Sequence, residues 1–380
     1  MLGWRWDIFC TVVDNYGDIG VCWRLARQLA GEHGYQVRLW VDDLASFQRL
    51  CPGVDPARER QLAEGVEVRH WAADFPVVEP ADVVVEAFAC HLPERYVADM
   101  AAREAKPLWV NLEYLSAEDW VEDCHGLASP HPRLPLTKYF FFPGFSPATG
   151  GLLQERGLEE ERRVFLADPA AQEAFWRELG LGPRGDELRV SLFGYGDEDV
   201  AGLLTAWAEG ERPVVALVPE GRSAAPLAGF FGVDRAPAGS VFRRGRLEAR
   251  VLPFIAQEKY DRLLWACDCN FVRGEDSFVR AQWAAKPLVW RIYPQQEEAH
   301  LIKLEAFLGR YGSGLSPQAQ GALQTLESAW NEGGNTGGAW DAFWAHQAEL
   351  GQHAVQWAET LRSHGDLLSN LVNFLKNKVK

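Results

Sequence analysis

The residues best suited to chemistry come early in the chain, in the loop Asp14–Gly20 with the sequence DNYGDIG. A strand-like segment precedes this loop and a helical one follows it, and in open α/β sheets such turns lie at the carboxyl edge, where ligands bind. The loop lacks GxGxxG spacing, and the carboxylates of Asp14 and Asp18 would repel a pyrophosphate and suit a cationic ligand. A structural alternative remains, in which Asp14 starts a turn and Asp18 caps or favours the N-terminus of a helix that begins near Val21.

A second loop of this kind has the sequence RGEDS, from Arg273 to Ser277. A helix beginning near Ser277 would offer free backbone N–H groups and the positive end of its dipole, both of which suit a diphosphate. Arg273 would add a fixed positive charge without a metal ion. Glu275 would turn to ribose or sugar hydroxyls, which donate to a carboxylate. The structural alternative is a cap formed by Asp276 or Ser277, with Arg273 in a surface ion pair.

Aromatic residues stand beside two further turns, in the sequences FGYG and PFIAQ. A flat nucleobase could stack on Phe193, Tyr195 or Phe254, and Gln257 could bind the hydrogen-bonding edge of thymine or uracil. Tyr293 ends another expected strand and is a weaker candidate of the same kind. Taken singly, each of these aromatic residues could instead fill a core.

A further carboxylate ends a strand-like segment in the sequence NLEY. Because the carboxyl ends of parallel strands share one sheet edge, Glu113 is expected to join Asp14 and Asp18 in an acidic pocket. An exposed or arginine-paired glutamate is the alternative. The sequence contains no HExxH pair and no GxSxG elbow, which disfavours a zinc protease and a hydrolase triad.

Alternating strand and helix patterns position these loops. Short apolar runs such as DVVVEAF and PLWVNL suit strands of a parallel sheet that is covered on both faces. Helical segments instead keep one apolar stripe at helical spacing. In the first half the expected strands are 7–13, 36–41, 66–70, 81–88 and 107–114, with helices over 21–33 and 93–104.

The pattern stops where Pro and Gly crowd in FFFPGFSPATGG, and it then resumes. In the second half the expected strands are 188–193, 213–219, 250–254, 269–272 and 287–293, and the expected helices are 197–209, 257–268, 277–286 and 296–311. The sequence therefore predicts two doubly wound, Rossmann-like α/β domains followed by a helical tail. The expected boundaries are 1–152, a connecting segment 153–184, and 185–361, with a helix at about 362–380 that packs back on the first domain.

Composition and charge narrow the classes of partner. The 380 residues, 47% of them apolar and 24% charged, are typical of a globular protein with two cores. The net charge of -15 opposes nucleic-acid binding and favours a basic protein partner. Seven cysteines without CxxC spacing predict neither a disulfide framework nor a zinc site. No run reaches the roughly 18 apolar residues of a membrane span, so we expect a cytoplasmic protein without a metal.

Together these motifs resemble the bacterial elongation factor P arginine rhamnosyltransferases, whose GT-B fold has two Rossmann-like domains facing a central cleft. The resemblance spans nearly the whole chain, and its most specific parts are DNYGDIG and VRGEDSFVRAQ. It implies inverting transfer of rhamnose from dTDP-β-L-rhamnose to an arginine of elongation factor P, which assists translation through polyproline stretches, with no cofactor.

The resemblance also implies roles for individual residues. Its catalytic candidates are Asp14, Asp18 and Glu275. Its nucleotide-sugar contacts fall on Phe193, Tyr195, Phe254, Gln257, Arg273, Glu275, Asp276, Ser277 and Tyr293. With the position of Glu113 at the same sheet edge, we expect the acceptor contacts to be Asp14, Asn15, Tyr16, Gly17, Asp18 and Glu113.

The implied chemistry agrees with the residue types. The guanidinium of arginine stays protonated, so its nitrogen is a poor nucleophile until a carboxylate orients it and accepts a proton. We expect Asp18 to act as the general base while Asp14 and Glu113 hold the guanidinium, although either aspartate could take the proton. The leaving dTDP would be stabilised by Arg273 and the helix N-terminus near Ser277 rather than by a metal ion.

Two other functions keep the same fold. One is a GT-B glycosyltransferase or sugar epimerase that acts on a small molecule, and the other is a nucleotide-regulated binding protein without turnover. The acidic loop of the first half disfavours a neutral sugar acceptor. Several carboxylates near a diphosphate site disfavour a protein that only binds.

Overall fold

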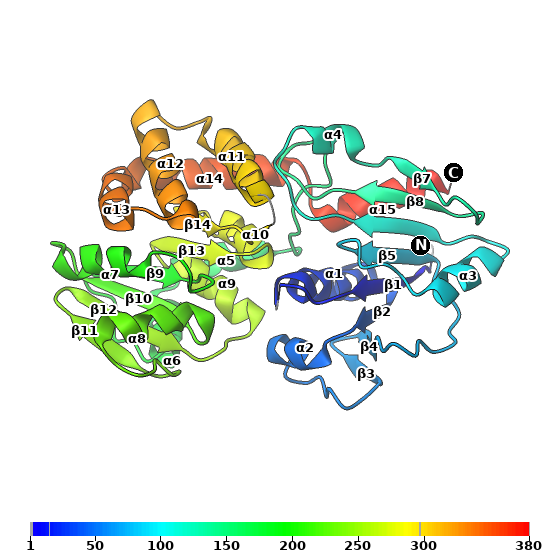
Figure 1. Cartoon of the computed structure of the whole chain (residues 1–380), viewed down its shortest axis with the longest axis horizontal. Helices are drawn as coiled ribbons and strands as arrows, with labels where there is room; N and C mark the ends of the chain where they lie inside the picture. Colours follow the sequence, from blue (N-terminus) through cyan, green and yellow to red (C-terminus); the bar gives the residue numbers. More distant parts are fainter. Residues whose placement is uncertain (1–2, 15, 296–297, 380) are drawn as a thin grey trace. The chain divides into compact units, whose positions relative to one another are not determined.

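The computed structural model describes residues 3–14, 16–295 and 298–379. The chain divides into two compact units. Unit 1 consists of Met1–Arg156 and Leu361–Lys380, and unit 2 consists of Gly157–Thr360 (Figure 1). No helix within the described residues is long and apolar enough to cross a membrane.

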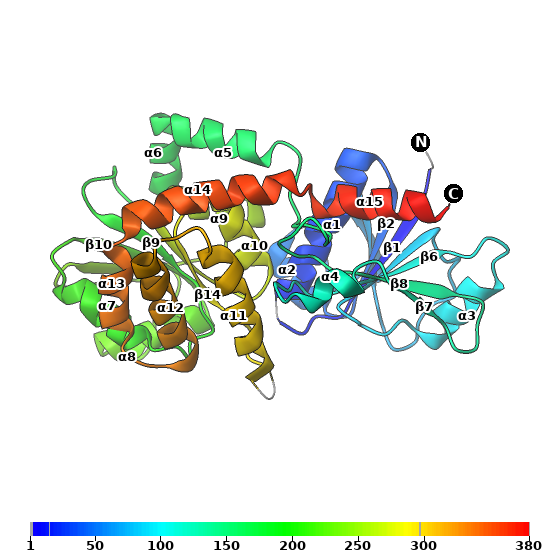
Figure 2. The ribbon, with the colours of Figure 1, turned by 90° about the horizontal axis from the view of Figure 1, so that it is seen from above.

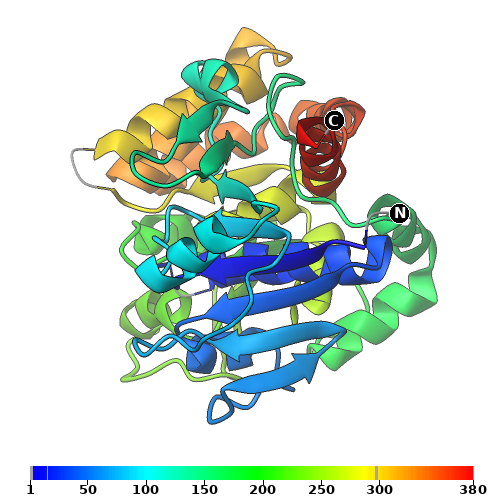
Figure 3. The ribbon, with the colours of Figure 1, turned by 90° about the vertical axis from the view of Figure 1, so that its right-hand side faces the viewer.

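Unit 1 is built on an eight-stranded sheet with the order β3-β4-β2-β1-β5-β6-β8-β7. The strands from β4 to β8 in this order run parallel, and only the edge strands β3 and β7 pair antiparallel (Figure 3). The central strand β5 is buried along its whole length, which is why its sequence VVVEA shows no polar alternation. The strands are β1 (Arg5–Cys10), β2 (Gln36–Val41), β3 (Arg60–Ala63), β4 (Val66–His70), β5 (Val83–Ala87), β6 (Leu108–Leu112), β7 (Ala128–Pro130) and β8 (Thr137–Phe141).

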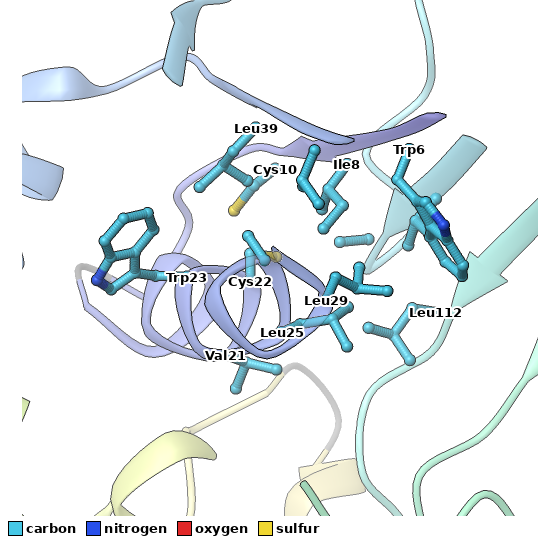
Figure 4. Packing of buried hydrophobic residues seen from close by; sticks show 14 of the residues in the cluster. Trp6, Ile8, Cys10, Val21, Cys22, Trp23, Leu25, Leu29, Leu39 and Leu112 are labelled. Carbon is cyan, nitrogen blue, oxygen red and sulfur yellow. The ribbon is translucent and has the colours of Figure 1, made fainter. Parts of the chain in front are cut away.

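Helices cover both faces of this sheet, and α1 makes the largest core. Figure 4 shows one layer of that core, in which side chains of β1 meet those of α1. Gly34 ends α1 with a φ of 68°, a left-handed conformation that glycine adopts without strain. The helices of unit 1 are α1 (Gly17–His33), α2 (Leu44–Leu50), α3 (Glu94–Ala102), α4 (Trp120–Cys124) and α15 (Leu367–Lys378).

The C-terminal helix α15 belongs to the core of unit 1 and lies alongside α1 (Figure 2). Its buried stripe is formed by Leu367, Leu368, Leu371, Val372 and Leu375. The Asn370 side chain donates to the carbonyl of Gly150 at 3.0 Å, which ties the helix to the end of the N-terminal segment. The C-terminal helix therefore completes the core that the N-terminal segment of unit 1 forms.

Unit 2 repeats the same topology with six strands in the order β11-β12-β10-β9-β13-β14. All neighbours pair in parallel except the edge strand β11. The strands are β9 (Leu188–Leu192), β10 (Val214–Pro219), β11 (Val241–Arg244), β12 (Leu247–Leu252), β13 (Cys269–Arg273) and β14 (Leu288–Arg291).

Aromatic packing holds one helix of unit 2 to its sheet, and a buried ion pair joins two of its helices. The rings of Phe278 and Trp290 stack with their centroids 3.7 Å apart, and the buried guanidinium of Arg280 donates to both oxygens of Asp261 at 3.0 and 2.8 Å. The helices are α5 (Leu158–Ala167), α6 (Pro169–Glu178), α7 (Val200–Glu209), α8 (Ala225–Phe231), α9 (Gln257–Ala266), α10 (Asp276–Ala284), α11 (Ala299–Gly312), α12 (Pro317–Glu332), α13 (Thr336–Trp344) and α14 (Gln347–Ser363), with a short 3₁₀ turn at Arg222–Ala224.

The predicted fold class, two doubly wound α/β halves with a helical C-terminal region, is confirmed. Two helices begin earlier than expected, because α1 includes Gly17 and Asp18 and α10 includes Asp276. The expected start of a helix at Gln296 lies outside the described residues, and α11 is described from Ala299. The edge strands β3, β7 and β11 were not predicted, since each is short and pairs on one side only.

Candidate active site

The strand order of unit 1 reverses between β1 and β5, because the chain adds β2 and β4 on one side of β1 and β5, β6 and β8 on the other. The helices that follow β1 and β5 pack into different cores of the sheet, and in this topology ligands bind at the carboxyl ends of such strands. The loop that follows β1 carries the predicted residues Asp14 and Asp18. The acidic loop is thus at the position where this topology binds ligands.

Asp18 lies in the first turn of α1 and is 3% exposed. Its carboxylate folds back on the loop, and one oxygen accepts hydrogen bonds from the backbone N–H groups of Val13 and Asp14, both at 2.8 Å. The helix begins at Gly17 rather than near Val21, so Asp18 is not its N-cap; it lies in the first turn of α1, where a negative charge favours the helix N-terminus, and Asp14 starts the turn before it.

Burial dominates the electrostatics of Asp18. Removal of the carboxylate from water raises the pKa of Asp18 above its usual value, and the negative charge of Asp14 adds to that rise. The backbone hydrogen bonds from Asp14 and Val13 act in the opposite direction, because they stabilise the charged form. A raised pKa is the property expected of a carboxylate that accepts a proton during a reaction.

The other predicted residues of this loop lie around Asp18. The backbone N–H of Gly17 donates to the carbonyl of Asp14 at 2.7 Å. A Cβ on Gly17 would lie 3.0 Å from a carboxylate oxygen of Asp14, so a side chain there would displace that carboxylate. Tyr16 is partly exposed at the start of α1. Asn15, also a predicted residue, lies outside the described residues.

Glu113 directly follows β6, which pairs in parallel with β5 as β5 does with β1, so the end of β6 lies at the same sheet edge as the β1 loop. The backbone N–H of Glu113 donates to the carbonyl of Phe141 at 3.0 Å, and its carboxylate accepts from the side-chain amide of Asn111. The structure therefore places Glu113 at the same sheet edge as Asp14 and Asp18, partly exposed.

The loop after β5 was not predicted to take part in the site. Three of its residues, Phe88, Ala89 and His91, have φ values of 56°, 54° and 53°. Residues other than glycine rarely adopt this left-handed backbone conformation, and strained backbone of this kind is concentrated at functional sites. The buried carboxylate of Glu86 holds the loop, because it accepts from the backbone N–H of His91 at 3.2 Å and from Lys138 at 3.1 Å.

Unit 2 has its own strand reversal, between β9 and β13. The loop after β9 carries Phe193 and Tyr195, and β13 ends at Arg273. The guanidinium of Arg273 lies between the two rings, 4.6 Å from the centroid of Phe193 and 4.3 Å from that of Tyr195. Tyr293 meets Tyr195 edge to face with centroids 5.7 Å apart. The structure thus brings the predicted arginine and three predicted aromatic residues together.

The start of α10 supplies backbone donors beside Arg273. Gly274 makes the turn with a φ of 60°, and Glu275 is the N-cap of α10 without a side-chain cap bond. The Ser277 hydroxyl accepts from the backbone N–H of Arg273 at 3.1 Å and donates to its carbonyl, so this hydroxyl stabilises the turn. A helix N-terminus beside a fixed arginine is suited to bind a phosphate group.

Two predicted residues after β12 complete the sheet edge of unit 2. Gln257, buried at the start of α9, donates to a carboxylate oxygen of Asp276 at 3.2 Å, which links the loop after β12 to α10. The backbone N–H of Phe254 donates to Glu220 at 3.3 Å, and its side chain is partly exposed.

Sequence reasoning missed a carboxylate in the β9 loop. The buried side chain of Glu198 accepts from the backbone N–H groups of Tyr195 at 2.5 Å and Gly196 at 2.8 Å. Arg291 lies 3.6 Å from Glu198 and 3.0 Å from Asp197. The run DED after FGYG was the available signal, but a charged run most often marks a solvated surface.

No group of three or more His, Cys, Asp or Glu residues in the described part of the chain is arranged to hold a metal ion. The candidate residues of unit 1 and those of unit 2 form two clusters that differ in the sign of the charge they present. The cluster of unit 1 presents carboxylates and suits a cation that can give up a proton, whereas the cluster of unit 2 presents a guanidinium, aromatic rings and a helix N-terminus and suits a nucleoside diphosphate.

The raised pKa of Asp18 has a consequence for stability. Since the folded-state pKa exceeds the unfolded one, the Asp18 charge destabilises the fold above its ordinary pKa, and the cost disappears at low pH where both states are protonated. We expect Asp18→Asn to melt at a higher temperature than the wild type at pH 7.5, with a difference that shrinks toward pH 4. Calorimetric melting over this pH range measures it.

The matched control is Asp43→Asn, at the N-cap of α2. Hydrogen bonds from Ser46 and Ala45 lower the pKa of Asp43, so its charge stabilises the fold at neutral pH and its neutral variant should melt at a lower temperature. A decrease of the same sign in Asp18→Asn would contradict the dominance of burial at Asp18.

Comparisons with known proteins agree with this arrangement. Residues 6–376 match the family described as Elongation-Factor P (EF-P) rhamnosyltransferase EarP. The protein-arginine rhamnosyltransferase of Pseudomonas putida is 53% identical over 374 residues, which cover 98% of this chain and 99% of that protein. The protein of the same name from Neisseria meningitidis serogroup B is 37% identical, with 98% of this chain and 97% of that protein covered.

Solved structures give the same result for the fold. A structure described as the basis for EarP-mediated arginine glycosylation of translation elongation factor EF-P matches with a TM-score of 0.70 and 36% identity, over 98% of this chain and 99% of that one. A glycosyltransferase from Rickettsia africae shares the fold at 7% identity, with a TM-score of 0.55 and full coverage of both chains. The resemblance inferred from the motifs is confirmed: the chain belongs to the EarP family of elongation factor P rhamnosyltransferases and is a GT-B glycosyltransferase.

Proposed function

We propose that this rhamnosyltransferase takes rhamnose from dTDP-β-L-rhamnose and transfers it, with inversion at the anomeric carbon, to a guanidinium nitrogen of one arginine of elongation factor P. The observation that carries the proposal is the division of charge between two strand reversals, with buried Asp18 at one and Arg273 between two aromatic rings at the other. A cationic acceptor and an anionic nucleotide donor require these opposite environments.

The acceptor chemistry explains the carboxylates of unit 1. A guanidinium nitrogen carries no free electron pair for attack until it is deprotonated or loses its proton as the new bond forms. In the proposed step, this nitrogen bonds to the anomeric carbon, the bond from that carbon to the diphosphate oxygen breaks, and the proton passes to Asp18. Asp14 and Glu113 hold the guanidinium in place, and burial raises the pKa of Asp18 toward the range of an effective base.

The donor chemistry explains the cluster of unit 2. Charge develops on the diphosphate as dTDP leaves, and Arg273 with the backbone N–H groups at the start of α10 stabilises that charge. The rings of Phe193, Tyr195, Phe254 and Tyr293 offer flat surfaces to the thymine, with Gln257 and Asp276 at its polar edge. Glu275 binds sugar or ribose hydroxyls and supports the reaction from the donor side.

The proposal includes no metal ion and no other cofactor. In many transferases a divalent cation neutralises the leaving diphosphate. Here a guanidinium and a helix N-terminus can supply that positive charge, and both are fixed before substrate binds.

The modified protein is proposed to act on translation through polyproline stretches. We place the reaction in the cytoplasm, since translation occurs there and all seven cysteines of the chain are free thiols.

The donor assignment predicts which variants lose nucleotide binding. Arg273→Ala removes the fixed charge, so we expect the Kd for dTDP to rise by roughly tenfold or more, the effect of one hydrogen-bonded charge. Phe254→Ala should weaken binding as well, whereas Asp18→Asn should leave it within about twofold. Isothermal calorimetry measures these constants, and Arg243→Ala, at an exposed ion pair on β11, is the matched control. Loss of dTDP binding in Asp18→Asn, or tighter binding of NAD than of dTDP, would refute the assignment.

The proposal that the leaving dTDP is stabilised without a metal ion gives a separate prediction. Initial rates of rhamnose transfer should change by less than about twofold after dialysis against EDTA, because the charge that stabilises dTDP comes from the chain. Activity that disappeared with chelator and returned with magnesium would contradict this part of the mechanism.

The acceptor assignment predicts a strong preference for a folded partner. An always-charged guanidinium needs accurate placement, and contacts far from the reacting atoms can supply the energy for it. Mass spectrometry should show that intact elongation factor P, or its isolated first domain, gains one deoxyhexose at least about a hundredfold faster than a linear peptide with the same arginine. An acceptor Arg→Lys variant should stay unmodified. Equal rates for peptide and protein would exclude docking, and modification of lysine would exclude a guanidinium-specific site.

A further inference from the structure

A buried carboxylate determines the shape of the loop after β9. The side chain of Glu198 is fully buried and accepts from the backbone N–H groups of Tyr195 at 2.5 Å and Gly196 at 2.8 Å. It also packs closely on the residue before them, because a Cβ on Gly194 would lie 2.5 Å from an oxygen of the carboxylate. Only glycine leaves room at that position. The carboxylate of Glu198 therefore contacts three consecutive residues of the loop.

The Glu198 carboxylate is itself held by Arg291, at the end of β14. The guanidinium Nε lies 3.6 Å from Oε1 of Glu198, and Nη2 donates to Asp197 at 3.0 Å. The third nitrogen, Nη1, donates to the carbonyls of Trp330 and Asn331 in α12. Arg291 is 7% exposed, so its contact with Glu198 is shielded from water. The arginine thus joins the β9 loop to β14 and α12.

The position of Arg291 relates this contact to the proposed donor residues. Arg291 is the direct partner of Arg273 in the register of β13 and β14, and paired residues of neighbouring strands lie on the same face of a sheet. The guanidinium of Arg273 lies 4.3 Å from the centroid of the Tyr195 ring. Arg291 contacts the carboxylate three residues further along the same loop. Two arginines from neighbouring strands therefore hold the β9 loop.

We propose that Glu198 and Arg291 are positioning residues, which hold the backbone of the β9 loop so that the ring of Tyr195 is in place before the nucleotide binds. The inference deepens the proposed function, because it rests on Tyr195 as a contact of the nucleotide sugar. Neither Glu198 nor Arg291 is assigned a contact with the donor. A loop that is ordered before binding loses less conformational entropy when the ligand arrives, so the pair should affect donor affinity.

The role of Glu198 differs from that of the helix cap beside it. The N-cap of α7 is Asp199, whose side chain accepts from the backbone N–H of Gly202 at 3.1 Å and from the Thr336 hydroxyl at 2.9 Å. The two backbone donors of Glu198 instead precede it in the chain. Asp199 thus supports the helix and Glu198 supports the loop, so substitution of each residue separates stability from positioning.

The first test follows the ring of Tyr195 and needs no turnover. The protein is labelled with 3-fluorotyrosine, and the ¹⁹F resonance of Tyr195 is the one that is missing from Tyr195→Phe. In Glu198→Gln this resonance should shift and broaden, because the amide has one acceptor oxygen where the carboxylate has two, and it loses the charge that faces Arg291. The matched control, Asp199→Ala, should lower the melting temperature through the lost cap and leave the resonance unchanged.

The second test measures the effect of the loop on the donor. Glu198→Gln should raise the Kd for dTDP about tenfold, the effect of one hydrogen-bonded charge. KM for the donor should rise in proportion, while kcat stays within about twofold of the wild type. A variant that merely folded less well would show a lower kcat at unchanged KM, because it would contain less active protein. Asp199→Ala should keep the wild-type Kd.

A double-substitution cycle tests whether Arg291 acts through Glu198. Arg291→Lys keeps the charge but loses the planar fork that contacts Glu198 and α12 together, so it should also weaken dTDP binding. Its combination with Glu198→Gln should raise the Kd by less than the product of the two single effects, because both changes remove one interaction. A Kd equal to that product would reject the pairing of the two residues.

The outcomes distinguish this inference from the proposed function. A wild-type protein that binds no dTDP would reject the proposed donor, while the ¹⁹F spectra would still test the loop. A Glu198→Gln protein that keeps either the wild-type resonance of Tyr195 or the wild-type Kd for dTDP would reject the positioning role with the transferase activity intact.

Discussion

The reversal of strand order in each sheet is the constraint on which the rest of the structure depends. In unit 1 the reversal separates the connections that leave β1 and β5, and in unit 2 it separates those that leave β9 and β13. Because the connections from adjacent strands diverge at these four strand ends, the loops there are not covered by the sheet core. Polar groups can therefore lie there without disturbing the core. Asp18, Phe88, Tyr195 and Arg273 all lie at these ends, and the apolar runs behind them hold the strands in register.

The acidic cluster carries an electrostatic cost that the fold tolerates. Burial raises the pKa of Asp18, and Asp14 adds repulsion, yet two backbone hydrogen bonds hold the carboxylate in one orientation. A carboxylate that is destabilised in the free protein gains more from the arrival of a cation than one already paired with an arginine. The left-handed backbone at Phe88 is a second local cost, and the buried carboxylate of Glu86 holds that loop in place.

Much of this arrangement could be predicted from the sequence, because it depends on local patterns. The apolar runs indicated the parallel strands, and the loops DNYGDIG and RGEDS were placed at strand ends by their neighbours alone. The stacking of Phe88 on Tyr114 could not be predicted, since it joins two loops that only the strand order brings together. The left-handed backbone at Phe88 also left no signal, because glycine is the residue that usually marks such a conformation.

The two reversals have the same topology and opposite chemistry, and internal carboxylates explain how. In Rossmann-like domains the turn after the first strand normally offers its backbone N–H groups to a pyrophosphate. In unit 1 the N–H groups of Val13 and Asp14 are taken by Asp18, and in unit 2 those of Tyr195 and Gly196 are taken by Glu198. In each unit a carboxylate of the chain thus accepts from the backbone donors that this fold commonly offers to a phosphate. A nucleotide diphosphate is therefore directed to the start of α10 beside Arg273, and the first turn of unit 1 is left with a negative charge that suits arginine.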